Sequence, residues 1–234
     1  MKAKHNHIVR PLTTWEHDKR YYMIQPLAEW DLSNYMARWE TTSTISPDER
    51  CNVLKQLYGL ATALREVHGD GAKVVGTHMD IKLENVLVFS TGGGPVTFKL
   101  TDFGCANIGQ MDPRDIWSLG AMMLEILVWL IRGPKLDAFR TKRGEEFEVE
   151  GEKTQAVGAV EDDMFYYFGK DGKPHLKPVV IREINDLKVE VSTVPDPTLR
   201  KPLMVFLNVI EMMLKVPKDE RPTAKDVCAK LKAI

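Results

Sequence analysis

Hydrophobic residues recur at helical spacing between residues 47 and 68. They fall at Val53, Leu54, Leu57, Leu60, Ala61, Leu64 and Val67, which together make one broad apolar face. Ser46-Pro47-Asp48-Glu49 precedes them with a capping serine, a first-turn proline and two acidic residues. The pattern therefore predicts a helix that begins after Ser46 and ends near His68-Gly69-Asp70-Gly71.

Four other stretches have the same helical character. The first begins at Asp31 and places Leu32, Tyr35 and Met36 on one face. The other three cover Asp115 to Arg132, Leu199 to Val216, and Thr223 to Ile234. Residues 133–197 mix charged runs with glycine and proline, so their pattern supports no assignment. Within them the run from Lys142 to Lys153 is expected to be a solvated loop or insert.

Short apolar runs between polar residues predict strands. His7 to Leu12 and Arg20 to Gln25 form one plausible pair, and Val86 to Phe89 with Val96 to Leu100 form a hairpin around residues 90–95. Long helical stretches and few strands predict an α+β fold that is mainly α-helical, with small β-hairpins.

Composition narrows the class of protein. Of 234 residues, 44% are hydrophobic and 28% are charged, and 32 basic against 33 acidic residues leave a net charge of −1. This balance favours a folded domain and provides no field that would recruit nucleic acid or a membrane surface. The apolar run from Leu119 to Ile131 contains Glu125 and is too short to cross a bilayer. Three scattered cysteines make no disulfide framework, so an intracellular location, cytoplasmic or nuclear, is expected.

Candidate chemistry gathers around the second hairpin. Asp80, Lys82 and Asn85 lie just before its first strand, and Asp102 lies just after its second strand. Because a hairpin returns the chain on itself, these side chains are expected at one end of the two strands. Asn85 and Asp102 offer oxygen ligands that suit Mg²⁺. Asp80 could accept a hydroxyl proton, and Lys82 could stabilise a transferring phosphoryl group.

The same residues resemble the active site of eukaryotic protein kinases. His78-Met79-Asp80 stands where that family has His-Arg-Asp, and Asp80 to Asn85 keeps the D-x-K-x-x-N order of its Ser/Thr members. Asp102-Phe103-Gly104 matches the metal-binding D-F-G motif. The resemblance implies ATP and Mg²⁺ as cofactors, a protein substrate, and packing of His78 against Phe103.

Flanking segments follow the family in the same order. Tyr22 to Ala28 resembles the hinge, which implies that the backbones of Gln25 and Leu27 face adenine and that Leu87 lies under it. Asp115 to Gly120 resembles the start of the central helix, and Glu220 to Ala224 resembles the family's R-P-T turn. The resemblance divides the chain into an N-lobe remnant with the hinge (1–30) and a C-lobe (31–234) with an insert at about 133–198.

Several family features are missing, which leads us to expect an impaired enzyme. No G-x-G-x-x-G loop or V-A-I-K lysine precedes His5, and little chain separates Asp102 from Asp115, which leaves no room for an A-P-E motif. Met79 replaces the family's arginine, and Arg221 lacks the glutamate that the family pairs with it. The alternative function is a non-catalytic pseudokinase or protein-binding scaffold. Open strand edges in residues 5–27 are expected to favour a partner or oligomer.

Overall fold

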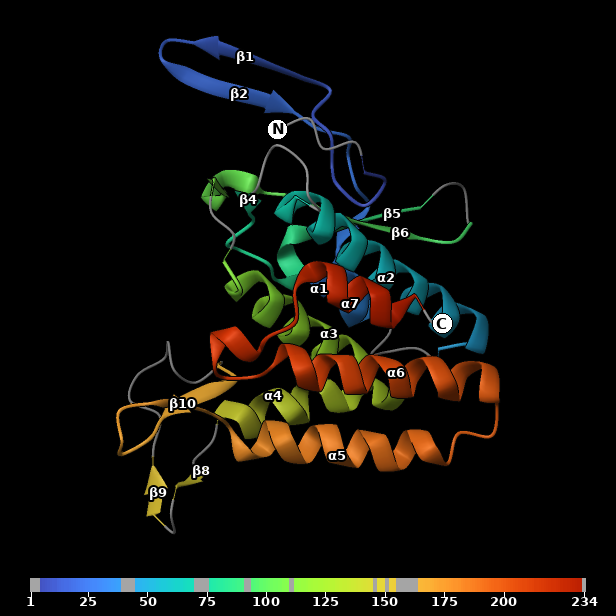
Figure 1. Ribbon diagram of the computed structural model, residues 1–234. Coiled ribbons are helices and arrows are strands. Elements are labelled where there is room, and N and C mark those ends of the chain that lie inside the picture. Colours follow the sequence, from blue (N-terminus) through green and yellow to red (C-terminus); the bar gives the residue numbers. More distant parts are fainter. Residues whose placement is uncertain are drawn as a thin grey trace.

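The computed structural model describes residues 5–38, 45–69, 76–90, 94–109, 112–144, 147–149, 152–154 and 164–232. A helical body carries several small antiparallel sheets (Figure 1). This arrangement confirms the prediction of a mainly helical α+β fold. No helix in the described part of the chain has the length and apolarity that a membrane span requires.

The longer helices are α1 (Leu32–Arg38), α2 (Pro47–His68), α3 (Arg114–Arg132), α4 (Leu136–Gly144), α5 (Pro178–Ser192), α6 (Pro197–Met213) and α7 (Ala224–Leu231). Single 3₁₀ turns lie at Leu83–Asn85, Phe103–Cys105, Gly133–Lys135 and Lys218–Glu220. Each of the five predicted helices is present, with ends that differ by a few residues from the prediction. Residues 39–40 and 233–234 lie outside the described part.

The strands are β1 (Thr13–His17), β2 (Arg20–Ile24), β3 (Trp30–Asp31), β4 (Gly76–Thr77), β5 (Val86–Phe89), β6 (Thr97–Leu100), β7 (Asn107–Ile108), β8 (Phe147–Val149), β9 (Glu152–Thr154), β10 (Tyr166–Phe168) and β11 (Pro174–Leu176). The predicted hairpin of β5 and β6 is present, with Val86 opposite Leu100 and Phe89 opposite Thr97. β3 extends it to three strands.

Helix α2 forms for the local reasons that its sequence indicates. The Ser46 hydroxyl accepts a hydrogen bond from the Glu49 N–H at 3.2 Å, which satisfies a donor that the first turn leaves open. At the other end Gly69 takes a left-handed conformation (φ 74°) that few other residues adopt. Its apolar face joins α3, whose residues from Met122 to Leu130 are all buried. Figure 1 shows α5 and α6 side by side beneath this pair.

Of the first predicted pair of strands, the one at Arg20 to Gln25 is present as β2, but the one at His7 to Leu12 is wrong. Residues 7–12 form no strand; Ile8 makes only a single parallel bridge to Leu100. The strand lies instead at β1, because Asp18 and Lys19 both take positive φ (50° and 60°) and form a tight turn that pairs β1 with β2. Trp15 and Tyr22 stack across this hairpin with ring centroids 5.1 Å apart. The hairpin projects away from the helical body (Figure 1).

The segment before this hairpin lies along β6. Leu100 donates its N–H to the His7 carbonyl, and Val9 donates its N–H to the Leu100 carbonyl, each at 2.8 Å. The His7 ring Nδ1 bonds the Phe98 carbonyl at 2.8 Å, and the ring lies directly against Gly59 of α2. These contacts attach residues 7–9 to the body, whereas every residue of β1 and β2 is exposed.

Residues 133–197, which the pattern left unassigned, contain α4, two hairpins and α5. The prediction of a solvated run from Lys142 to Lys153 is wrong for Arg143, which is 1% exposed. Its guanidinium pairs with Glu125 at 2.8 Å and stacks over the Phe165 ring at 4.3 Å. The remainder of that run lies largely outside the residues whose side chains are described.

Candidate functional site

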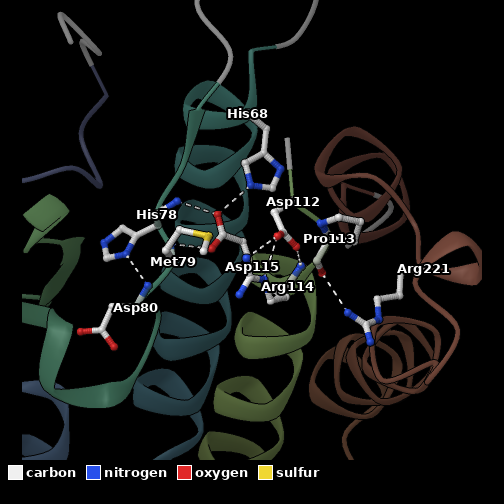
Figure 2. A network of polar contacts seen from close by, with 9 residues as sticks. All are labelled: His68, His78, Met79, Asp80, Asp112, Pro113, Arg114, Asp115 and Arg221. Carbon is white, nitrogen blue, oxygen red and sulfur yellow. Dashed lines mark hydrogen bonds and ion pairs between the residues drawn. The ribbon is translucent and has the colours of Figure 1, made fainter. Parts of the chain in front are cut away.

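A buried carboxylate holds the loop that precedes β5. Asp115, at the start of α3, accepts the backbone N–H of His78 at 2.7 Å and that of Met79 at 2.8 Å. The His68 ring, at the end of α2, bonds the same carboxylate at 2.9 Å (Figure 2). Burial alone would raise the pKa of Asp115, but these hydrogen bonds outweigh it and hold the pKa below its ordinary value. Asp115 is therefore an ionised anchor for the loop.

Met79 takes a left-handed backbone conformation, with φ of 71°. This conformation costs free energy for a residue with a side chain, and it persists where surrounding contacts impose it. Here the bond from the Met79 N–H to Asp115 supplies such a contact. The turn that it produces presents Asp80 on the far side of the loop from Asp115, as Figure 2 shows.

Three of the predicted site residues lie in direct contact. The Asn85 amide donates to the Asp80 carboxylate at 2.7 Å and to the Asp80 carbonyl at 2.8 Å. Lys82 Nζ lies 2.9 Å from the same carboxylate. The bond from Lys82 is the main reason that the pKa of Asp80 is lowered, and Asp80 in turn raises the pKa of Lys82. Asp80 is held as a carboxylate between a cation and an amide.

Asp102 begins a 3₁₀ turn in a left-handed conformation (φ 57°), and its side chain accepts the Gly104 N–H at 3.2 Å. No hydrogen bond joins it to Asp80 or Asn85, although its charge contributes to the raised pKa of Lys82. The predicted packing of His78 on Phe103 is present, with ring centroids 4.5 Å apart. Because His78 also bonds the Thr101 carbonyl at 2.8 Å, it connects the anchored loop to the segment that carries Asp102.

The chemistry of the donor set fits a hard cation such as Mg²⁺. The side-chain nitrogen of Asn85 donates to Asp80, whereas its side-chain oxygen, Oδ1, accepts no hydrogen bond from the described residues. Asp102 likewise uses one carboxylate oxygen for Gly104 and keeps the other. One amide oxygen and one carboxylate oxygen are ligands of the kind that Mg²⁺ uses together with water and phosphate oxygens. No cluster of three His, Cys, Asp or Glu side chains suited to a metal occurs among the described residues.

A groove lies beside this loop. Its volume is 890 Å³, and its lining includes Gln25, Leu27 and Leu87 together with Asn34 of α1 and Glu84. The three residues expected to face adenine therefore border one space, although Leu27 itself is 96% exposed. Asp102 lies outside this lining. Gln25 accepts a hydrogen bond from the Thr101 hydroxyl at 3.1 Å, which connects the groove to the residue before Asp102.

Sequence reasoning missed two members of the site. The sequence identifies Asp115 only as the start of a helix. The residues that follow it are so apolar that the start of the helix is expected to be buried, and a buried carboxylate requires hydrogen-bond donors. His68 carried no such signal, because its partner is distant in sequence. Cys105, which ends the Phe103–Cys105 turn, is exposed.

Comparison with known proteins agrees, over the first part of the chain, with the resemblance of its motifs to those of protein kinases. Residues 1–114 match the family model of the protein kinase domain. The match includes the loop from His78 to Asn85 and the Asp102-Phe103-Gly104 motif, and it ends where α3 begins. A search of curated proteins finds no match to this chain.

Proposed function

We propose that this chain carries a protein-kinase-like site for ATP-dependent phosphoryl transfer to Ser or Thr of a protein substrate, with greatly reduced activity. The observation that carries the proposal is the contact of Asp80 with both Lys82 and Asn85 on a loop anchored to Asp115. The match of residues 1–114 to the protein kinase domain supports it. On this proposal residues 1–30 correspond to an N-lobe remnant with the hinge and residues 31–234 to a C-lobe.

Each residue has a role that follows from its chemistry. Asp80, ionised by its lowered pKa, would accept a hydrogen bond from the substrate hydroxyl and take its proton. Lys82 would offset negative charge on the transferring phosphoryl group. Asn85 and Asp102 would hold Mg²⁺, which when bound neutralises charge on the phosphate oxygens. The backbones of Gln25 and Leu27, with the side chain of Leu87, would contact adenine in the groove.

Two internal features support reduced activity. Met79 replaces an arginine of the family motif, and the segment between Asp102 and Asp115 is too short to hold a peptide-docking loop. Phosphoryl transfer depends mostly on positioning and on charge stabilisation, so loss of substrate positioning lowers the rate by orders of magnitude.

The direct test is transfer of radiolabelled phosphate from ATP to generic protein substrates. We expect slow transfer at most, and any measured transfer must disappear in Asp80→Asn. Asp186→Asn, at an exposed position of α5, is the matched control and should leave the rate unchanged. Fast transfer, or transfer that survives Asp80→Asn, contradicts the assignment of Asp80.

A protein-binding scaffold is the second candidate, and the hairpin of β1 and β2 favours it. Leu12, Tyr21, Met23 and Ile24 expose 46–84% of their surface there. Both strands lack further neighbours among the described residues, and open edges with apolar side chains favour pairing with another chain. Concentration-dependent oligomerisation, or a partner captured through this hairpin and lost in Tyr21→Ser, would support the scaffold.

A further inference from the structure

A second pocket lies on the other side of Asp115 from the candidate active site. Its volume is 330 Å³, at the small end of the range for ligand sites. One wall is a chain of aromatic rings: Trp117 packs edge-on against Tyr166 at 6.0 Å, and Tyr166 packs against Phe168 at 5.7 Å. Val216 adds an aliphatic surface. Most of the pocket is therefore suited to an apolar body.

Positive charge borders the same space. Arg114, Lys218 and Arg221 all line it. Arg114 is neutralised by Asp112 at 2.7 Å, whereas Lys218 and Arg221 make no ion pair with a carboxylate in the described parts of the chain. The one acidic residue in the lining is Asp115, whose oxygens already accept bonds from His68, His78 and Met79. Neither cation therefore has a carboxylate bonded directly to it, although the charge of Asp112 acts on both from a distance.

The hydrogen bonds that Arg221 makes within the described parts of the chain use only three of its five N–H groups. Its Nε donates to the Lys215 carbonyl at 2.7 Å, and its terminal nitrogens donate to the carbonyls of Val216 at 3.0 Å and Pro113 at 3.3 Å (Figure 2 shows the last bond). A guanidinium has five N–H groups, so one remains on each terminal nitrogen. Two such groups can bind the two oxygens of a carboxylate.

The Arg221 guanidinium also lies 4.8 Å over the Trp117 ring, which joins the cationic site to the aromatic wall. Burial lowers the pKa of Arg221, with partial compensation from Asp112, so the surroundings stabilise its charge incompletely. The carbonyl bonds and the indole give Arg221 neutral partners in place of the glutamate that the family pairs with it. They do not neutralise its charge.

We propose that this pocket binds a carboxylate carried on an apolar body, with the carboxylate at Arg221 and Lys218 and the body against Trp117, Tyr166 and Phe168. Two sources can present this chemistry: a small free acid, or an acidic side chain beside an apolar one in a protein segment. The proposal does not depend on phosphoryl transfer, because the pocket lining contains only Met79 from the loop that carries Asp80, together with Asp115, which anchors that loop.

The test uses benzoate and its neutral isostere benzamide, titrated into the full chain and followed by the NMR signals of the Trp117 indole N–H and the Arg221 Nε–H. Benzoate should shift both signals saturably and bind at least tenfold more tightly than benzamide. Lys218→Gln and Phe168→Ala both alter exposed side chains, so the fold should persist while benzoate affinity falls. Arg221→Gln should remove the preference for benzoate, whereas the control Arg182→Gln on α5 should change nothing.

Two matched capped hexapeptides identify the source. One carries Leu-Glu at its centre and the other Leu-Gln, both with Gly and Ser on either side. Tighter binding of the Leu-Glu peptide than of benzoate assigns the site to a protein segment, and the reverse assigns it to a free acid; both outcomes support the site. Equal affinity for benzoate and benzamide, or affinity unaffected by Lys218→Gln and Phe168→Ala together, overturns it.

Discussion

Met79 donates its backbone N–H to Asp115 at 2.8 Å, so a residue in the left-handed conformation is bonded to a buried carboxylate at the start of α3. This bond joins two parts of the chain that the sequence separates by the whole β5–β6 hairpin. The bond fixes the turn from which Asp80 extends. The position of Asp80 therefore depends on Asp115, which takes no part in the proposed chemistry itself.

Asp115→Asn is expected to destabilise the fold by roughly 1–3 kcal/mol. The substituted amide must place an NH₂ group against one of the N–H donors of His68, His78 or Met79, which leaves a buried donor unsatisfied. Urea unfolding measures the change. Asp186→Asn, on the exposed side of α5, serves as the control and should alter stability by less than about 0.5 kcal/mol. Equal stability of the two variants would show that Asp115 is no anchor.

Mild acid should loosen the segment at His7. Burial lowers the pKa of His7 below 6.5, and the bond to the Phe98 carbonyl opposes this only in part. As the pH falls through 6.5, the unfolded chain takes up a proton that the folded chain does not, so folding stability decreases until the pH reaches the folded pKa. Unfolding measured at pH 7.5 and pH 5.5 should show a larger loss for the native chain than for His7→Asn, which does not titrate. An equal loss in both would exclude His7 as a source.

Gly59→Ala should displace His7 from α2. A Cβ at Gly59 would overlap the His7 ring, and one of the two must move. Overpacking of this kind costs about 1–3 kcal/mol. The amide protons of Val9 and Leu100, which bond across the same segment, should exchange faster in the variant, whereas Lys55→Ala, at an exposed position of α2, should leave them unchanged. Unaltered exchange in Gly59→Ala would show that the contact does not hold the segment.

The β1–β2 hairpin should exchange its amide protons much faster than the helices around Leu57 and Leu124. Its residues are all exposed, whereas both leucines are completely buried. A two-stranded hairpin alone is marginal in water. Hydrogen exchange on a monomeric sample measures the contrast, and strong, equal protection in both regions would contradict it.

The sequence predicts an element of the fold where the residues that determine it lie close together in the chain. The helix at Pro47–His68 follows from Ser46 and Gly69, and the β5–β6 hairpin from two short apolar runs, so both were found. β1 was missed because its side chains are mostly polar and its position is determined by the turn at Asp18 and Lys19.

Within the site, the contact of Asp80 with Lys82 and Asn85 follows from their closeness in the chain. The bonds from His68 to Asp115 and from Arg221 to Pro113 join residues far apart in sequence. No local pattern indicates such bonds. For the same reason the pocket at Arg221 becomes visible only when the helices are packed.

Nucleotide binding tests the central claim most directly, because it depends on Asn85, Asp102 and the groove and does not require turnover. In a calorimetric titration of the full chain with ATP, we predict a Kd on the order of 0.1 mM or weaker, since the described groove would cover only one side of adenine. Binding should weaken without Mg²⁺ and in Asp102→Asn, and it should be unchanged in Asp186→Asn. Sub-micromolar affinity, or binding that neither Mg²⁺ nor Asp102→Asn alters, would contradict the assignment.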